Sequence, residues 1–183
     1  MLPTKSEANP QNPSIDIEIR ARDPLGLTPL PVESRQRYLR FSFFQKNEAL
    51  IPLSHILEVM NLPLEDVLAV PDMPSCVLGV CVWQSETLWL IDLNGMMHHP
   101  PLPLQSQIRE SPTVIVIQSQ QKSLGLVVDS VGDIDLFDPS HIRMQVGICS
   151  PSLEPYVEGY CPDGVSTVLD VSRIFESPLL QPC

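Results

Sequence analysis

The stretch from Val77 to Leu93, VLGVCVWQSETLWLIDL, decides the fold of this chain. Two apolar segments flank a polar turn at Gln84-Ser85-Glu86, and the second segment ends at Asp92. Both segments carry apolar side chains on both faces, which is typical of strands that are covered on two sides or curled into a barrel. The stretch therefore predicts a β-hairpin in a packed core, whose turn presents polar groups on a rigid scaffold.

Similar signals for short elements recur along the rest of the chain. Alternating apolar residues bounded by turn residues predict strands at 38–44, 49–53, 113–118, 124–131, 156–160 and 166–170, with 134–136 extending the strand at 124–131. Short helices are predicted at 54–60, 93–98 and 171–176. Many short strands with close turns and little helix point to an all-β fold of barrels or a sandwich.

The length of 183 residues allows one core of ordinary size or two small cores that share an interface. Residues 1–35 contain six prolines and few apolar clusters, so they are expected to form a disordered tail. The folded domain is expected at 36–177, and residues 178–183 are expected to form a C-terminal tail.

The charge balance argues against some classes of partner. Eleven Lys and Arg against 22 Asp and Glu give a net charge of −11, and no Lys or Arg occurs between Lys46 and Arg109. Such a surface repels phosphate backbones and anionic lipid, so nucleic acid is not expected as a partner. A protein surface rich in Lys and Arg is a better candidate, although an acidic excess that only maintains solubility explains the charge equally well.

The sequence lacks an apolar run near the roughly 20 residues of a bilayer span, and its N-terminus does not resemble a signal peptide. We therefore expect a cytoplasmic protein without membrane insertion. The five cysteines are scattered, which favours reduced thiols. Cys76 and Cys81 are expected to be small buried apolar residues.

Residue patterns for catalysis are missing. There is no Gly-x-Ser-x-Gly elbow, no phosphate-binding glycine loop and no closely spaced cysteine pair, while His98 and His99 precede prolines in a loop. Asp92, Asp129 and Asp170 each end a strand, where they are expected to accept backbone hydrogen bonds rather than act as acid or base. No enzyme activity, catalytic residue, cofactor or metal is expected.

Several blocks resemble the CheW family, the adaptors that couple chemoreceptors to a histidine kinase. The blocks are Ile51-Pro52-Leu53, Glu58-Val59, Val70-Pro71 through Pro74, Gly79-Val80, Trp89-Leu90-Ile91-Asp92-Leu93, Gly125 to Val131, Gly159, Asp163-Gly164 and Val168-Leu169-Asp170. Their order and spacing extend the resemblance over residues 38–175. It implies two small five-stranded SH3-like β-barrels packed side by side, with short helices and no enzymatic activity.

The resemblance also implies where partners bind. In the family a hydrophobic groove between the barrels receives the helical tip of the receptor. The partner-binding positions that match in this chain are Leu53, Ile56, Glu58, Gly79, Gln84, Val128 and Val131.

This chain departs from the family at two places in the hairpin. Gln84 and Ser85 replace the Arg-Gly of the turn, which removes a charge and a fork of donors. Trp89 replaces a strand proline, either as a core filler or as a contact anchor.

Two functions are consistent with these residues. The first is a coupling protein between the cytoplasmic tip of a methyl-accepting-type receptor and a CheA-type histidine kinase, in chemotaxis, phototaxis or pilus motility. The alternative is a regulatory decoy that binds kinase or receptor without completing the array, as the changed turn suggests.

Overall fold

Ten strands are present in the part of the chain that the structure, a computed structural model, describes. The described residues are 34–43, 46–98, 112–144, 151–161 and 166–180. The strands are β1 Gln36–Phe43, β2 Asn47–Pro52, β3 Ile56–Asn61, β4 Val77–Trp83, β5 Glu86–Asp92, β6 Thr113–Ser119, β7 Lys122–Val128, β8 Ser130–Phe137, β9 Val157–Tyr160 and β10 Thr167–Leu169. The expected tail at 1–35 lies outside the described residues except for its last two positions.

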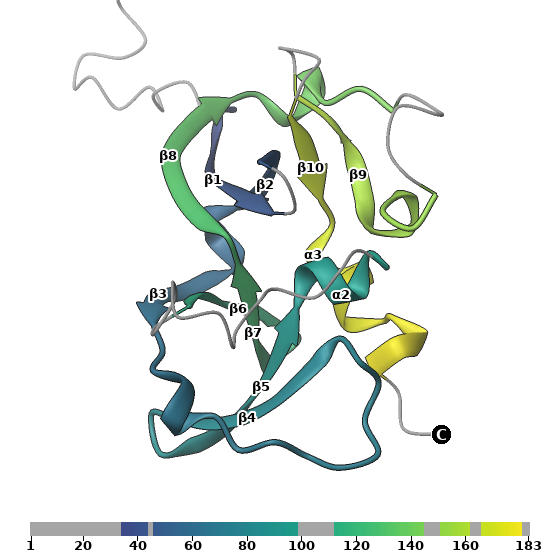
Figure 1. Cartoon of the computed structure of the whole chain (residues 1–183). Helices are drawn as coiled ribbons and strands as arrows, with labels where there is room; N and C mark the ends of the chain where they lie inside the picture. The colour runs from purple at the N-terminus through teal and green to yellow at the C-terminus, as the bar shows by residue number, and fades with distance from the viewer. Residues whose placement is uncertain (1–33, 44–45, 99–111, 145–150, 162–165, 181–183) are drawn as a thin grey trace, which may run out of the picture. The chain divides into compact units, whose positions relative to one another are not determined.

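The strands form two five-stranded sheets (Figure 1). The first has the order β8-β1-β2-β10-β9, and the second has the order β3-β6-β7-β5-β4. We call them the first barrel and the second barrel. The fold class predicted from the sequence, two small five-stranded barrels with short helices, is confirmed.

The helices are short, and both α-helices follow an aspartate. They are α2 Leu93–Met96 and α3 Val171–Phe175, with single 3₁₀ turns at η1 Leu53–His55, η2 Leu64–Asp66, η3 Pro139–His141, η4 Glu154–Tyr156 and η5 Pro178–Leu180. Asp92 accepts a hydrogen bond from the backbone N–H of Asn94 at 3.0 Å, and Asp170 accepts one from Ser172 at 2.9 Å. Each carboxylate satisfies an N–H that the helix leaves open. The expectation that these two aspartates accept backbone hydrogen bonds is confirmed.

The hairpin that decides the fold forms as predicted. β4 and β5 pair antiparallel and close with Trp83 opposite Glu86. Gln84 and Ser85 make the two-residue turn between them with φ of 48° and 67°. Two consecutive positive φ values are typical of the type I′ turn, whose twist matches that of the flanking strands.

The prediction of a helix at 54–60 is wrong. Only η1 is helical there, and β3 pairs antiparallel with β6, from Ile56 opposite Ile117 to Asn61 opposite Thr113. A short apolar run fits either a helix or a strand by its periodicity, and pairing with a neighbouring strand satisfies every second backbone group of this segment.

The predicted extension of the second hairpin by residues 134–136 is also wrong. β7 ends at Val128, and the N–H of Asp129 then donates to the carbonyl of Ser42 in the first barrel at 2.9 Å. β8 continues along β1 in the first barrel, as Figure 1 shows. Alternation in the sequence predicts a strand but does not identify its partner.

The largest core cluster lies between the two sheets, and we call it the inter-sheet core. Its buried members come from both sheets, from α2 and α3 and from connecting segments, and they include Leu39, Phe41, Ile51, Ile91, Leu93, Ile115, Leu126, Val128, Leu169 and Ile174. A smaller cluster fills each barrel, around Leu88 and Val116 in the second barrel and around Tyr38 and Val168 in the first. The barrels therefore pack side by side on a shared apolar layer.

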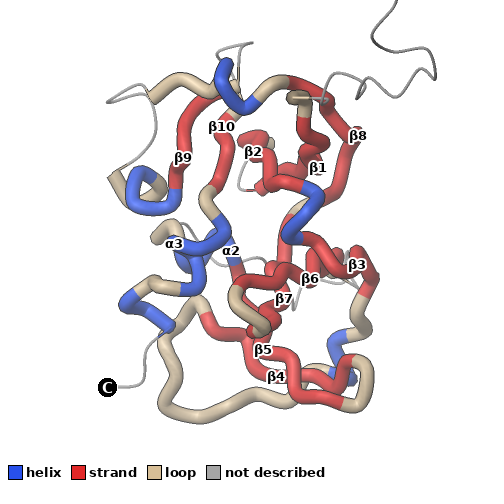
Figure 2. The backbone as a smooth tube through the Cα atoms, turned by 180° about the vertical axis from the view of Figure 1, so that it is seen from behind, coloured by secondary structure: helices blue, strands red, loops and turns tan. Residues whose placement is uncertain are grey.

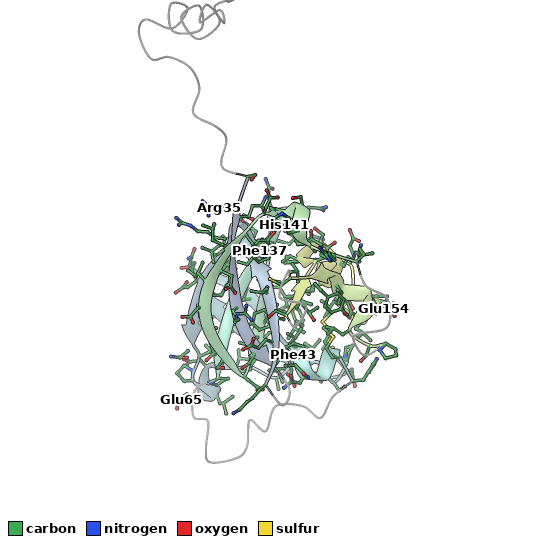
Figure 3. All side chains as sticks on the ribbon, turned by 90° about the horizontal axis from the view of Figure 1, so that it is seen from above. Arg35, Phe43, Glu65, Phe137, His141 and Glu154 are labelled. Atoms are coloured by element: carbon green, nitrogen blue, oxygen red, sulfur yellow. The ribbon has the colours of Figure 1, made fainter. Side chains whose placement is uncertain are left out.

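Ring stacking closes the first barrel at one end. The rings of Tyr38 and Phe137 lie 4.2 Å apart and nearly parallel, at 8°. Phe137 ends β8 opposite Gln36 at the start of β1, and Figure 3 labels it near Arg35. Burial raises the pKa of the Tyr38 hydroxyl above its ordinary value.

Cys76 and Cys81 are free thiols and are each 2% exposed, which confirms them as buried residues. Burial raises the pKa of both thiols. Thiols of this kind are protonated and poorly reactive near neutral pH.

Candidate partner-binding surfaces

Four of the seven predicted site residues meet at the inter-sheet core. Leu53, Ile56 and Val131 are partly buried and pack against this core, and Val128 is one of its members. They come from η1, β3, β7 and β8, so the structure brings together residues that are up to 78 positions apart in the sequence. The margin of the inter-sheet core is therefore a candidate surface.

Val128 differs from the other three because it is 0% exposed. A side chain without any accessible surface does not touch a partner in this conformation. Its position in the core gives it a packing role beneath the surface, and the accessible parts of the margin belong to its neighbours.

An exposed apolar row continues from this margin along β8. Val131 lies opposite Phe41 and Ile134 lies opposite Leu39, so these residues point to the face of the sheet that carries the inter-sheet core. Ile134 is 55% exposed, and Leu136, two residues further on the same face, is 48% exposed. We call Val131, Ile134 and Leu136 the β8 row.

Ile134 and Leu136 are not among the site residues predicted from the sequence. The available signal was their alternation with Asp133 and Asp135, which indicates a strand with one apolar face. This strand lies at the edge of its sheet, so the outer part of that face remains open to solvent.

Arg40 holds the opposite face of β8 in place. Its Nε donates to Oδ2 of Asp135 at 2.9 Å, and its Nη1 donates to Oε2 of Glu48 at 2.6 Å. Ser166 also accepts from this guanidinium. These contacts connect β1, β2 and β8, and they fix the orientation of β8, so that the β8 row lies on the face away from Arg40.

Glu58 and Gln84 belong to a second surface, at the end of the β4–β5 hairpin. The indole Nε1 of Trp83 donates to Oε2 of Glu58 at 2.7 Å, and the exposed Gln84 follows Trp83 directly. The hydrogen bond joins β3 to β4, the two edge strands of the second barrel. The structure therefore places Glu58 near the turn, in a group separate from the four residues at the inter-sheet core.

Gly79 has a structural position. It is buried with φ of +142°, and a Cβ at this position would lie 2.2 Å from the carbonyl oxygen of Leu68. Leu68 and Val80 exchange two backbone hydrogen bonds, at 2.8 and 2.9 Å. A residue without a side chain is required here so that the backbone of Leu68 can approach the strand.

Trp89 is not a core filler. Its side chain is 38% exposed, and it lines an open pocket with residues of β7 and of the C-terminal segment. An exposed aromatic ring beside a pocket is typical of a contact position. The alternative of a contact anchor is therefore the one that its position favours.

The described ranges could also contain a metal site or a membrane span. There, no three or more His, Cys, Asp or Glu side chains gather as metal ligands would, and the absence of a metal remains a prediction. His99 and the cysteines at 149 and 183 lie outside these ranges. None of the described helices is both long enough and apolar enough to cross a bilayer.

Comparison with known proteins shows the family of this chain. The chain is 22% identical over 156 residues to the chemotaxis protein CheW of Treponema pallidum (strain Nichols), across 83% of this chain and 91% of that protein. The crystal structure of the scaffolding protein TtCheW from Thermoanaerobacter tengcongensis has the same fold, with a TM-score of 0.66 at 16% identity over 80% of this chain and 97% of TtCheW. The family model described as a CheW-like domain matches residues 38–179. The chain therefore belongs to the CheW-like domain family of chemotaxis scaffold and adaptor proteins.

Proposed function

We propose that this chain is a cytoplasmic, non-enzymatic adaptor that couples the cytoplasmic tip of a methyl-accepting-type receptor to a CheA-type histidine kinase. The β8 row is the observation that carries the receptor part of the proposal. It is an exposed apolar strip at the margin of the inter-sheet core, where Leu53 and Ile56 also reach the surface. Figure 1 and the reverse view in Figure 2 both show β3 and β8 on the same side of the two barrels.

The apolar row suits a helical partner. A helix presents apolar side chains in a stripe, and such a stripe can cover Ile134 and Leu136 together. About half of each side chain is still exposed in the free protein. Covering this remainder contributes about 1 kcal/mol for each residue, since complete burial of such a side chain contributes about 1.5–3 kcal/mol.

Asparagine substitutions test this surface without adding charge next to Asp133 and Asp135. Ile134→Asn and Leu136→Asn should each weaken binding to the receptor's cytoplasmic fragment about fivefold, as the loss of about 1 kcal/mol requires. Val82→Asn is the matched control, because Val82 is 79% exposed on an edge strand of the other sheet. Isothermal titration calorimetry gives the affinities, and circular dichroism verifies the fold of each variant.

The measured affinities decide whether the β8 row is the receptor site. If the two β8 variants bind as the parent does, or if Val82→Asn loses as much affinity as they do, the β8 row is not the receptor site.

A regulatory decoy is the second candidate, and the neutral turn at Gln84-Ser85 favours it. A coupler raises kinase activity when it is added to receptor and kinase, whereas a decoy lowers the activity of a mixture that already contains a working adaptor. If apolar contacts carry receptor binding in a coupler, Gln84→Arg should leave the receptor affinity unchanged or raise it slightly, because an exposed charge mainly tunes rate and specificity. A large gain of coupling in Gln84→Arg would show instead that the native turn disables the site.

A further inference from the structure

The pocket beside Trp89 belongs neither to the β8 row nor to the surface at Glu58 and Gln84. It has a volume of about 560 Å³, and it opens where β5 and the start of β7 meet the C-terminal segment. Its walls are mostly apolar and include Met73, Trp89, Phe175 and Leu180. Small-molecule sites in proteins typically have volumes of about 300–1,000 Å³ and walls of this kind.

Strand geometry explains why the pocket is apolar. β5 and β7 run parallel with Leu90 beside Gly125 and Ile91 beside Leu126, so the residues just before them, Trp89 and Leu124, are neighbours on the opposite face from Leu90. Ile91 and Leu124 belong to the inter-sheet core. The pocket is therefore the open end of this core.

The C-terminal segment forms the opposite wall. Phe175 ends α3 and Leu180 ends η5, and both are partly buried against the inter-sheet core. In Figure 1 this yellow segment lies beside the lower barrel, which contains β5 and β7. A molecule in the pocket would contact the sheet and the C-terminal segment at the same time.

Among the described residues that line this pocket, Lys122 is the only charged one. It begins β7, two positions before Leu124, so its side chain leaves the strand on the same face. Its ammonium group forms no ion pair with any residue in the described ranges. A free cation at the rim of an apolar pocket, in a chain with a net charge of −11, is complementary to a ligand with one anionic group.

We propose that this pocket binds a small amphipathic carboxylate, with the apolar part between Trp89, Phe175 and Leu180 and the carboxylate at Lys122. A strand added by a partner protein is disfavoured, because β5 and β7 are each paired on both sides within the sheet. The occupant is then held by side chains alone, as a small ligand is. A bound ligand would contact the C-terminal segment and thereby influence its position.

The test uses three probes with one chain length, octanoate, octan-1-ol and octylammonium, and the full protein without receptor or kinase. The chain has two tryptophans, so the indole N–H signals in a ¹⁵N–¹H correlation spectrum report on two sites. Trp83 is the internal reference, because its indole is hydrogen bonded to Glu58 and does not line the pocket. Trp89→Phe assigns the two signals.

Octanoate should shift the Trp89 signal in a saturable way and leave the Trp83 signal unchanged. Octan-1-ol should bind about fivefold more weakly, which corresponds to the upper range for a solvent-exposed ion pair, and octylammonium should bind more weakly still. Lys122→Gln should remove the preference for octanoate over octan-1-ol. Lys46→Gln removes the same charge at a residue outside the pocket and should keep the preference.

Several results would overturn the proposal. They are the absence of a saturable shift at Trp89, equal shifts of both indoles, and an unchanged preference for the carboxylate in Lys122→Gln. If the three probes fail while a peptide with an acidic and an aromatic residue shifts only Trp89, the pocket receives a protein segment and the proposal is wrong. Because receptor and kinase are absent, none of these results depends on the proposed adaptor function.

Discussion

Replacing Gly79 by alanine should destabilise the second barrel strongly, although the change adds only one methyl group. Gly79 has φ of +142°, a conformation that residues with a side chain rarely adopt. The new Cβ would also lie 2.2 Å from the carbonyl oxygen of Leu68, which is a backbone atom and cannot rotate away. The segment at Leu68 must therefore move off the strand.

The magnitude follows from two contributions. Holding a residue with a side chain in this backbone region costs about 1–3 kcal/mol. Moving Leu68 breaks its two hydrogen bonds with Val80, each of which contributes about 0.5–1.5 kcal/mol. We therefore expect Gly79→Ala to lower the free energy of unfolding by about 4 kcal/mol, which is a large part of the 5–15 kcal/mol that is usual for a domain.

Urea unfolding followed by circular dichroism measures this change. With a slope of about 2 kcal/mol per molar urea, the midpoint should fall by about 2 M. Gly132→Ala is the matched control, because a Cβ at this strand position would meet its nearest neighbour, the carbonyl oxygen of Arg40, at an ordinary 3.6 Å. The control should stay within about 0.5 kcal/mol of the parent. A loss below about 1 kcal/mol for Gly79→Ala would refute the structural role of this glycine.

Three further predictions concern the turn, a carboxylate and the thiols. Ser85→Gly should raise the free energy of unfolding by about 0.5–1 kcal/mol in the same urea assay, because glycine adopts the φ of 67° without strain. An unchanged free energy of unfolding would show that Ser85 is not strained at this φ. Hydrogen bonds lower the pKa of Asp138 from 3.8 to about 2, and the hydrogen bond with Ser34 has the largest effect. The ionised carboxylate of Asp138 therefore stabilises the folded state. Its contribution should be complete above pH 3.8 and should be lost as the pH falls towards 2, and a carboxyl NMR titration with a midpoint near 4 would contradict this. Cys76 and Cys81 should resist a thiol reagent in the folded protein at pH 8 and react in urea, as peptide mass spectrometry can establish, because burial raises the pKa of both thiols; rapid labelling of either in the native protein would contradict their burial.

Much of the fold could be predicted because its local signals are strong. The hairpin around Gln84 has apolar strands and a short polar turn, and Asp92 and Asp170 are good caps that stand directly before short helices. These features depend on residues close together in the sequence. The positions of most strands could be predicted for the same reason.

The remaining features depend on pairing between distant residues. β3 is a strand because β6 is available beside it. β8 does not extend the hairpin of β6 and β7, because it pairs with the open edge of β1 in the other sheet. The accessibility of the site residues is also a property of the packed structure. Val128 and Ile134 are both apolar residues in strands, yet the first is 0% and the second 55% exposed. Periodicity alone does not distinguish a central strand from an edge strand.

The crossing of β8 into the first barrel has a consequence for the order of assembly. The second barrel is built from the continuous segment β3 to β7, whereas the first barrel combines β1 and β2 with β8, β9 and β10. The second barrel is therefore an insertion within the first. On the ribosome, all strands of the inserted barrel emerge before β8. Meanwhile β1 waits for β8, which is 97 positions further along the chain from Tyr38 to Asp135, and β2 waits for β10, which is 118 positions further from Ala49 to Thr167. We expect the inserted barrel to fold first and to serve, through the inter-sheet core, as the surface on which the later strands complete the first barrel.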